Sequence, residues 1–376
     1  MTRLSELIYD LEQTALHPRR SVYRAMEETG KDALGCFPIY TPEEMVYAAG
    51  LLPVGMWGGK VEIRLADKYL QGFCCSIMRA NIEYGMQGTY DFLKAVIIPT
   101  FCDTLKCVCE NWKVAVSKVP LIAMVYPQNR LLPAGFQYLT AELQRVKEQI
   151  EAVCGVKITD EALESSYTLY EEYRAAMRHF TEIAADYPIT INPKVRHLII
   201  KAGYFMDKKK YTEVITEITS ALQNMKPEAY RGHRIVMTGL IGEPNALLEI
   251  LQEAEIAVVA DDFAQESRQY RTPGRAEGTA VEKMAYRIVD QRGCTFLYEE
   301  QKSKGEMIAG MVKRTNADGV ILCMMKFCDP EEFDYPILKE ALEGAGIPLL
   351  YIEIDQQMDS YEQIRTRIQS FAEMIK

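Results

Sequence analysis

One order of segments occurs twice in this chain, and this internal repeat restricts the fold more than any other feature. In the first copy the apolar run 96–98 precedes Cys102-Asp103, and in the second copy the run 320–322 precedes Cys328-Asp329. A predicted helix follows each pair. A proline opens the next apolar run 18 residues after the cysteine in the first copy and 20 residues after it in the second. Short apolar runs that alternate with helices are typical of parallel sheets covered by helices.

We therefore predict an α/β protein with two related Rossmann-like lobes, each built on a parallel sheet. An apolar stripe near the N-terminus predicts a docking helix, and the apolar residues between Phe136 and Cys154 recur at helical spacing. The predicted parts are an N-terminal helical arm (1–34), a first α/β lobe (35–134), a helical connector (135–228) and a second α/β lobe (229–376). Parallel sheets bind ligands at the carboxyl ends of their strands, so the repeat predicts a site between the lobes.

Charge and hydrophobicity narrow the class of partner. The chain has 376 residues, with 43 basic and 53 acidic side chains and a net charge of −10. This balance argues against nucleic acid or an anionic membrane surface as a broad partner. No window reaches the roughly 18 apolar residues of a membrane helix, and the N-terminus lacks the apolar stretch of a signal peptide. We expect a cytoplasmic protein.

Ten cysteines are many for a chain in a reducing compartment, where they should be thiols, ligands or catalysts rather than disulfides. Cys102 and Cys328 follow equivalent strands, which favours a shared site. Cys75 is the candidate for a third member, and at most one of Cys74 and Cys75 is expected to be a ligand because neighbouring side chains diverge. Four further cysteines are predicted to be small buried hydrophobes: Cys107, Cys109, Cys154 and Cys323.

Dispersed thiols suit some metal centres better than others. Structural zinc usually has paired C-x₂₋₄-C motifs, and none is present here. No histidine forms a motif with a cysteine, which favours structural roles for His17, His179, His197 and His233. Thiolates without nearby histidine suit an iron–sulfur cluster. Three thiolates would leave one iron open to a ligand from outside the protein.

Several longer motifs resemble the 2-hydroxyacyl-CoA dehydratases, whose wider superfamily includes the benzoyl-CoA reductases, and the resemblance spans nearly the whole chain. The run around Cys328 resembles the smaller, β-type subunit in particular. The motifs are Cys36–Glu44, Cys75-Ser76-Ile77-Met78-Arg79, Pro99–Leu105, Pro127–Arg130, Ala260–Asp262 with Gln265–Gln269, and Met324–Glu332.

The resemblance implies a heterodimer of similar subunits, each with a [4Fe–4S] cluster on three cysteines. By matching motif, the ligands here are Cys75, Cys102 and Cys328, and the pattern Cys-Ser-x-x-Arg selects Cys75 over Cys74. The implied reaction removes water from an (R)-2-hydroxyacyl-CoA to give a 2-enoyl-CoA through a ketyl radical anion. The implied partners are an α-type subunit, which binds the acyl-CoA, and an ATP-hydrolysing iron–sulfur activator, whose electrons this subunit's cluster relays. Some relatives also bind a flavin, which no pattern in this chain supports.

No catalytic acid or base is assigned. Glu43 and Glu44 are candidates by position, although two glutamates at a helix start more often interact with the helix dipole. Asp103 and Asp329 could hydrogen-bond to the backbone near the cluster or cap the helices that follow them, and the capping role is favoured. A third acidic site, Asp261-Asp262 with Arg268, follows a predicted strand, and a polar rim or an interdomain ion pair is as good an interpretation of it as a ligand contact.

Two alternatives remain open. A benzoyl-CoA reductase-like subunit would reduce an aromatic thioester instead of dehydrating a hydroxyacyl thioester. A two-lobed binding protein without enzymatic activity would have only buried thiols. The sequence does not specify the acyl chain, the fourth cluster ligand or the higher oligomeric state.

Overall fold

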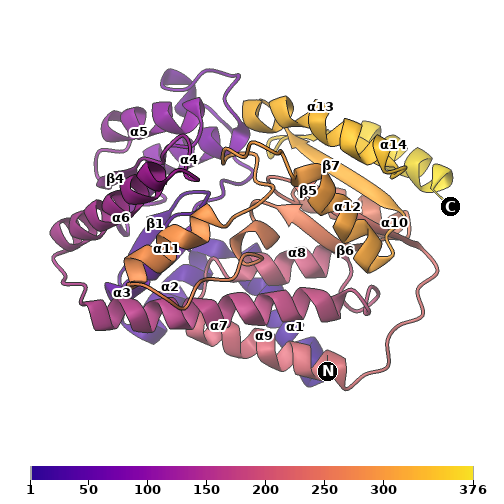
Figure 1. Ribbon diagram of the computed structural model, residues 1–376, viewed down its shortest axis with the longest axis horizontal. Coiled ribbons are helices and arrows are strands. Elements are labelled where there is room, and N and C mark those ends of the chain that lie inside the picture. Colours follow the sequence, from indigo (N-terminus) through magenta and orange to yellow (C-terminus); the bar gives the residue numbers. More distant parts are fainter. Residues whose placement is uncertain (1, 376) are drawn as a thin grey trace.

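Two parallel β-sheets of four strands each organise the structure, a computed structural model that describes residues 2–375 (Figure 1). The first sheet has the order β2-β1-β3-β4, and the second has the order β6-β5-β7-β8. The equivalent strands therefore occupy equivalent places, and the apolar runs of the sequence repeat form β3 and β7. The strands are β1 (Ala33–Cys36), β2 (Leu52–Gly55), β3 (Leu93–Pro99), β4 (Leu121–Met124), β5 (His233–Gly239), β6 (Ile256–Phe263), β7 (Gly319–Met325) and β8 (Leu349–Ile354).

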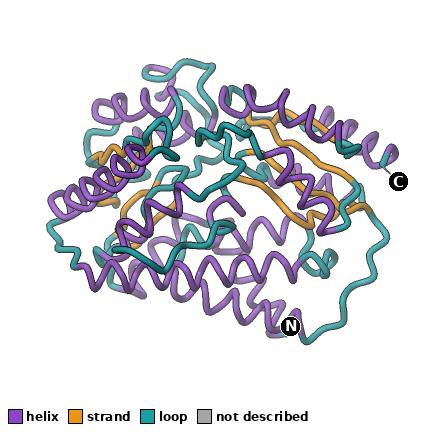
Figure 2. Tube along the Cα trace, viewed as in Figure 1, coloured by secondary structure: helices purple, strands orange, loops and turns teal. Residues whose placement is uncertain are grey.

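Helices connect and cover these strands, and Figure 2 shows them on both sides of the two sheets. The α-helices are α1 (Arg3–Leu16), α2 (Pro18–Thr29), α3 (Glu43–Ala48), α4 (Ser76–Met86), α5 (Asp103–Ala115), α6 (Pro133–Cys154), α7 (Asp160–Ala184), α8 (Pro193–Ala202), α9 (Lys208–Gln223), α10 (Asn245–Glu253), α11 (Ala280–Val289), α12 (Lys304–Thr315), α13 (Asp329–Gly344) and α14 (Glu362–Met374). Two short 3₁₀ helices span Ala66–Lys68 and Ser267–Gln269.

Strand β7 shows why a parallel strand here is apolar throughout. All seven of its residues are buried, because helices cover both faces of the sheet. Val320 and Leu322 pack in one hydrophobic cluster with residues of α12 and α13. Ile321 and Cys323 pack in the other cluster, which also contains residues of α10 and α14. Because side chains alternate along a strand, the apolar run serves both layers at once.

The remaining helices form a layer beneath both sheets. Helix α1 packs against α8 and α9, and α7 packs against α9, with one shared apolar cluster among them. Figure 1 shows α7, α9 and α1 running along the base of the molecule. Helix α6 packs instead against β3 and β4, so it covers the first sheet. None of the helices in residues 2–375 has the length and apolar character needed to cross a bilayer.

Several predicted element ends are correct, and others need correction. The pair Asn192-Pro193 predicts a cap and a first helical turn, and Gly155 predicts a helix end; Asn192 does cap α8, and Gly155 ends α6 in the left-handed conformation. A Thr-Pro pair such as Thr41-Pro42 is typical of a cap followed by the first helical position, but here Pro42 holds the cap position of α3 and the Thr41 hydroxyl donates to the Phe37 carbonyl. Strand β6 is longer than predicted. It continues through Asp261-Asp262, which pair with β5.

Candidate functional site

Each of the three candidate cysteines is the N-cap residue of a helix. Cys75 precedes α4, Cys102 precedes α5 and Cys328 precedes α13. Cys102 and Cys328 each lie three residues beyond the last residue of an equivalent strand, β3 or β7. The strand directs the chain to the edge of the sheet, and the helix then begins there. The N-termini of these helices present unpaired N–H groups and partial positive charge to whatever lies at the caps.

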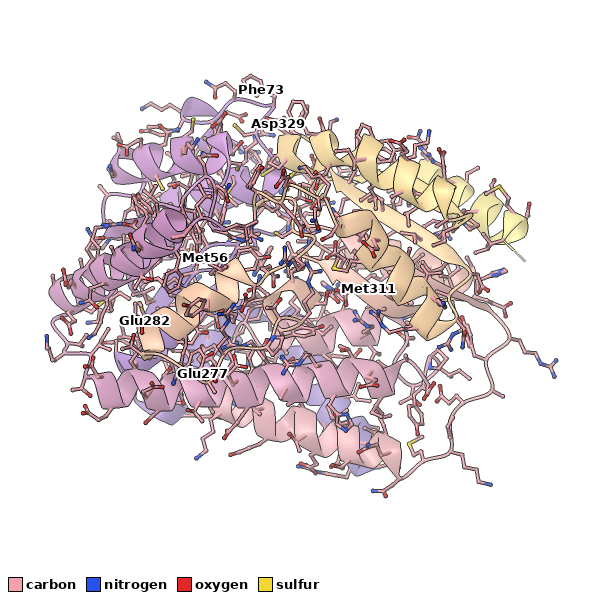
Figure 3. The ribbon with its side chains drawn as sticks, viewed as in Figure 1. Met56, Phe73, Glu277, Glu282, Met311 and Asp329 are labelled. Carbon is pink, nitrogen blue, oxygen red and sulfur yellow. The ribbon has the colours of Figure 1, made fainter. Side chains whose placement is uncertain are left out.

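One pocket brings the three thiols together. Cys75, Cys102 and Cys328 all line it, although they come from segments far apart in the chain. The pocket provides about 50 Å³ for the centres of water-sized molecules. One water needs about 10–15 Å³ by this measure, so there is room for a group of several atoms. Figure 3 labels Asp329, another lining residue, at the start of α13.

Apolar side chains dominate the rest of the wall and limit the access of water to the thiols. They come from the loops after β1, β2, β5, β7 and α11 and from the starts of α4, α5 and α13. The wall residues beside the cysteines are Pro38, Ile39, Trp57, Ile77, Met78, Asp103, Thr104, Leu105, Leu240, Phe296, Phe327, Asp329 and Pro330.

Burial keeps the thiols protonated in the absence of a metal. It raises the pKa of Cys75 to about 12, and it raises the pKa values of Cys102 and Cys328 as well. Peptide N–H groups in the first helical turns act in the opposite direction and favour the thiolates. The raised pKa values mean that a bound cationic metal centre would stabilise the thiolates and release protons.

The three thiols do not converge on one point, which bears on the kind of metal centre that they could hold. Zinc holds thiolates at about 2.3 Å, which places them roughly 4 Å from one another. Within residues 2–375, no three Cys, His, Asp or Glu side chains converge closely enough to hold one metal ion. The three thiols nevertheless face one pocket. This arrangement suits a polynuclear group, whose separate iron atoms each take one cysteine.

The other cysteines do not line this pocket. Cys74 is buried beside Cys75 but lies outside the wall. Cys109 and Cys323 are buried, as predicted. The prediction is wrong for Cys107, which is exposed because it lies on the solvent side of α5, and Cys154 is only half-buried near the end of α6.

The predicted capping role of Asp103 and Asp329 is also wrong. The cysteines hold the cap positions, and the aspartates hold the first position of each helix. Asp103 is exposed and pairs with Lys106 at 3.0 Å. Both aspartates line the pocket. A carboxylate in the first turn still interacts favourably with the helix dipole.

The two glutamates of α3 attach this helix to the helices beneath it. Glu44 is 1% exposed and pairs with Arg174 at 2.7 Å. Glu43 pairs with Lys208 at 3.2 Å and accepts a hydrogen bond from Tyr170. Neither glutamate lines the cysteine pocket. Their contacts therefore support structural ion pairs in addition to the expected dipole interaction.

The Asp261-Asp262 pair belongs to a buried ionic network. Asp261 pairs with Arg196 of α8, which is an ion pair between the connector and the second sheet. Asp262 pairs with Arg268 at 2.9 Å, and Arg268 pairs on its other side with Glu331 at 3.0 Å. Neither Asp261 nor Asp262 lines the cysteine pocket. Of the two structural interpretations, an ion pair between distant segments, α8 and β6, is the one present.

Glu331 connects this network to the cysteine pocket. It lies in the first turn of α13, it is 1% exposed, and Lys304 provides its second cationic partner at 3.1 Å. The peptide N–H of Glu331 favours the Cys328 thiolate. Arg268 and Lys304 therefore hold the turn that carries Cys328, and they neutralise the carboxylate beside it.

Sequence reasoning missed the aromatic part of the wall. Trp57, Phe296 and Phe327 come from three separate loops, and only folding brings them together. Phe327 could have been predicted as a wall residue, because it directly precedes Cys328. Its φ of +64° is rare for a bulky residue, and this turn directs the chain from β7 into α13. Nothing local in the sequence indicates the place of Trp57 or Phe296.

Comparison with known proteins adds independent evidence. The model of a family described as 2-hydroxyglutaryl-CoA dehydratase, D-component, matches residues 38–375. The chain is 41% identical to the (R)-phenyllactyl-CoA dehydratase beta subunit of Clostridium sporogenes and 43% identical to lactoyl-CoA dehydratase subunit beta of Anaerotignum propionicum, over the full length of both proteins in each case. It is 35% identical to the (R)-2-hydroxyglutaryl-CoA dehydratase subunit beta of Acidaminococcus fermentans, covering 99% of this chain and 100% of that subunit.

Proposed function

The chain belongs to the 2-hydroxyglutaryl-CoA dehydratase D-component family, and from this we propose that it is the β subunit of a 2-hydroxyacyl-CoA dehydratase. Such an enzyme is a hydro-lyase that converts a 2-hydroxyacyl-CoA into a 2-enoyl-CoA and water. Three full-length relatives are named as β subunits of enzymes with this activity, on phenyllactyl, lactoyl and 2-hydroxyglutaryl thioesters. Their acyl groups differ widely, so the proposal covers the reaction class and leaves the acyl chain open.

We infer that Cys75, Cys102 and Cys328 hold a [4Fe–4S] cluster in the pocket that they line. The observation that carries this inference is the meeting of three thiols, each at a helix N-terminus, in one largely apolar pocket with room for several atoms. Three thiolates and a cluster together carry negative charge, which helix N-termini stabilise. When bound, the cluster would supply one-electron transfer at low potential.

Four kinds of group in the protein would hold the cluster and set its surroundings: thiolates, helix N-termini, apolar wall residues and buried cations. The thiolates hold the cluster, and the first turns of α4, α5 and α13 offset its negative charge. Apolar wall residues such as Trp57 and Phe327 exclude water, and low solvent exposure is one of the factors that set cluster potentials. Arg268 and Lys304 pair with Glu331 and thereby fix the first turn of α13, which Cys328 precedes.

The function requires partners. A β subunit implies an α-type partner, and we propose that the α subunit binds the acyl-CoA while the cluster of this chain relays electrons. We further propose that the electrons come from an ATP-dependent iron–sulfur activator, because a strongly reducing electron is needed to form a ketyl from a thioester.

We also propose that the two sheets are copies of one Rossmann-like unit. Their identical strand order supports this, as does the placement of Cys102 and Cys328 after equivalent strands. The division into an arm (1–34), two lobes (35–134 and 229–376) and a connector (135–228) rests on the same argument.

Replacement of one proposed ligand tests the cluster site. Cys328→Ala should abolish most of the iron, the acid-labile sulfide and the visible absorbance of the anaerobically purified chain. Cys323→Ala is the matched control, because this buried thiol lies in β7 and outside the pocket. The control should retain its iron and sulfide. Full cluster content in Cys328→Ala would refute the ligand assignment.

Product analysis separates the two candidate enzymes. The complex should convert a 2-hydroxyacyl-CoA into the 2-enoyl-CoA and should not reduce an aryl-CoA. The names of the three full-length relatives favour dehydration. An anaerobic complex without iron and without either activity would instead support the binding-protein alternative.

A further inference from the structure

A second and larger cavity lies beside the cysteine pocket. It measures about 510 Å³, which is within the roughly 300–1,000 Å³ range of small-molecule sites. Its walls come from all four predicted parts of the chain: the α1–α2 junction, the loop after β2, α8, and the loops after β5 and β8. Trp57 lines both this cavity and the cysteine pocket. The strand ends that open here are carboxyl ends, where parallel sheets bind ligands.

The charges around this cavity differ from those of the whole protein. The chain has a net charge of −10, yet the cavity is lined by three cations, Arg19, Lys60 and Lys201, and by one carboxylate, Glu243. Lys60 pairs with exposed Asp359 at 2.8 Å, and Lys201 pairs with Glu243, so the lining side chains keep an excess of positive charge. No salt bridge involves Arg19 within residues 2–375. The cavity therefore favours an anionic group over a cationic one.

Hydrogen-bond donors remain available at the end of the cavity near α10. The Lys201 ammonium has three N–H donors, and Glu243 is its one hydrogen-bond partner among the described residues. The side chain of Asn245, also in the wall, makes no hydrogen bond within residues 2–375 and is half-buried. Pro244 at the N-cap of α10 provides no side-chain cap, and its carbonyl accepts from the Leu247 N–H at 2.9 Å, so within residues 2–375 the N–H groups of Asn245 and Ala246 remain without a cap partner.

The apolar part of the cavity wall consists mainly of aromatic rings. Five of the 22 wall residues are aromatic, roughly twice the 10% share of aromatics in the whole chain. Trp57, Tyr84, Tyr90, Phe92 and Phe205 provide faces and edges that pack well against a ring or an acyl chain. The larger aliphatic residues of the wall extend this apolar surface: Leu16, Val22, Val54 and Leu198.

We propose that this cavity binds an organic anion with an aromatic or acyl body, distinct from the cluster. The anionic group, a carboxylate in the first instance, is bound by Lys201, Asn245 and the start of α10. The body packs against Trp57 and the neighbouring rings. Because the ligand contacts arm, connector and both sheets, its binding also ties these parts together. The site goes beyond the proposed electron relay and does not require the cluster.

Tryptophan fluorescence tests the proposal directly, because Trp57 and Trp112 are the chain's two tryptophans. Trp112 is fully buried in the core, so Trp112→Phe leaves Trp57 as the reporter. The probe is 3-phenylpropanoate, titrated into the full-length Trp112→Phe chain, with uncharged 3-phenylpropanamide as the comparison. We expect a saturable change with the carboxylate and about tenfold weaker binding of the amide, the loss of a charge-assisted contact.

Variants on one helix locate the anion. Lys201→Met should weaken binding of 3-phenylpropanoate about tenfold. Lys194→Met is the matched control, because Lys194 lies on the same helix, pairs with Glu249 at 2.5 Å and does not line the cavity. Asn245→Ala, outside the buried ionic network, should weaken binding about threefold, which a half-buried hydrogen bond explains, and it serves if Lys201→Met fails to fold.

Three results would overturn the proposal. The first is the absence of a saturable fluorescence change with the carboxylate. The second is equal affinity for the carboxylate and the amide, which would make the cavity a purely apolar one. The third is equal weakening by Lys201→Met and Lys194→Met, or unchanged binding in Asn245→Ala if that variant has to replace Lys201→Met.

Discussion

Arg268 shows how one side chain supports both the fold and the candidate site. Its guanidinium is fully buried and bonds to Asp262 at the end of β6 and to Glu331 at the start of α13. Burial acts against the charged form of Glu331, but Lys304 and Arg268 outweigh it and hold the pKa of Glu331 below its usual value. A buried charge of this kind is tolerated only while its partners are present.

Removal of this guanidinium should therefore be costly. Arg268→Met leaves the Asp262 and Glu331 carboxylates with fewer cationic partners in the interior, and we expect a loss of about 3–5 kcal/mol in the free energy of unfolding. Urea unfolding of the full chain would measure it. Arg3→Met removes an exposed ion pair with Glu217 and should cost far less, because water screens exposed ion pairs. Equal losses in the two variants would contradict the role of Arg268.

At the residue scale, part of the candidate site could be predicted from the sequence. Cys102 and Cys328 could be selected because the repeat places them after equivalent strands. The capping role of Asp103 and Asp329 could not be ruled out, because Asp is a common N-cap and the cap differs from the first helical position by one residue. The partners of Glu44 and Asp262 come from distant segments, and no local pattern identifies them.

Two glycines with positive φ, Gly239 and Gly155, are required for different reasons. In Gly239, the last residue of β5, φ is +140°, and an added Cβ would lie 2.2 Å from the carbonyl oxygen of Cys323 on β7. At Gly155, which ends α6, φ is +67° and an added Cβ would meet no atom within 4 Å. The first glycine serves the contact between strands, and the second serves only a helix end.

These two glycines allow a matched comparison. Gly155→Ala should cost about 1–2 kcal/mol, the usual penalty for a left-handed alanine. Gly239→Ala should cost clearly more, because the clash with backbone adds to the conformational strain and forces β5 and β7 apart. Thermal or urea unfolding of both variants would measure the difference. A Gly239→Ala chain no less stable than Gly155→Ala would contradict this account of the strand contact.

Elements with a strong local signal were predictable. The apolar runs of β3 and β7, the cap of α8 and the end of α6 all follow from residue type and spacing. The end of β6 was less predictable, because Asp261-Asp262 looks like the start of a loop. The ion pairs to Arg196 and Arg268 compensate those two carboxylates inside the strand.

Over the whole molecule, a buried ionic network attaches the helical layer to the second sheet. His197 of α8 contacts Glu266, which follows β6, at 2.8 Å and Glu243, which follows β5, at 3.5 Å. Burial acts against the protonated imidazole, but the two glutamates outweigh it and raise the pKa of His197 above 6.5. The charged imidazole thus contributes to the attachment of the layer.

The sign of this shift predicts a pH dependence. A raised pKa in the folded state means that the stabilisation is fully present below the unfolded value of about 6.5 and is lost as pH rises through the folded value. The free energy of unfolding of the wild-type chain should fall in that range. In His197→Gln this part of the pH dependence should be absent, whatever the variant's absolute stability. The same slope in both chains would refute the assignment.

The twofold architecture was predictable because repeated order along the chain reflects repeated order in the sheets. The layer of helices beneath the two sheets was less predictable. Helical periodicity between residues 135 and 228 predicts helices but does not say which sheet they cover, and α6 packs on the first sheet while α7 to α9 join α1. The large cavity beside Trp57 combines all four parts, so only the folded chain reveals it.

The central claim is that Cys75, Cys102 and Cys328 together bind one iron–sulfur cluster. Diffraction from anaerobically grown crystals of the complex, recorded on both sides of the iron absorption edge, tests it most directly. We expect an anomalous iron peak in the pocket of this chain, bonded to these three sulfur atoms. Iron bonded to other residues of the chain, or a pocket without iron in an active complex, would contradict the account.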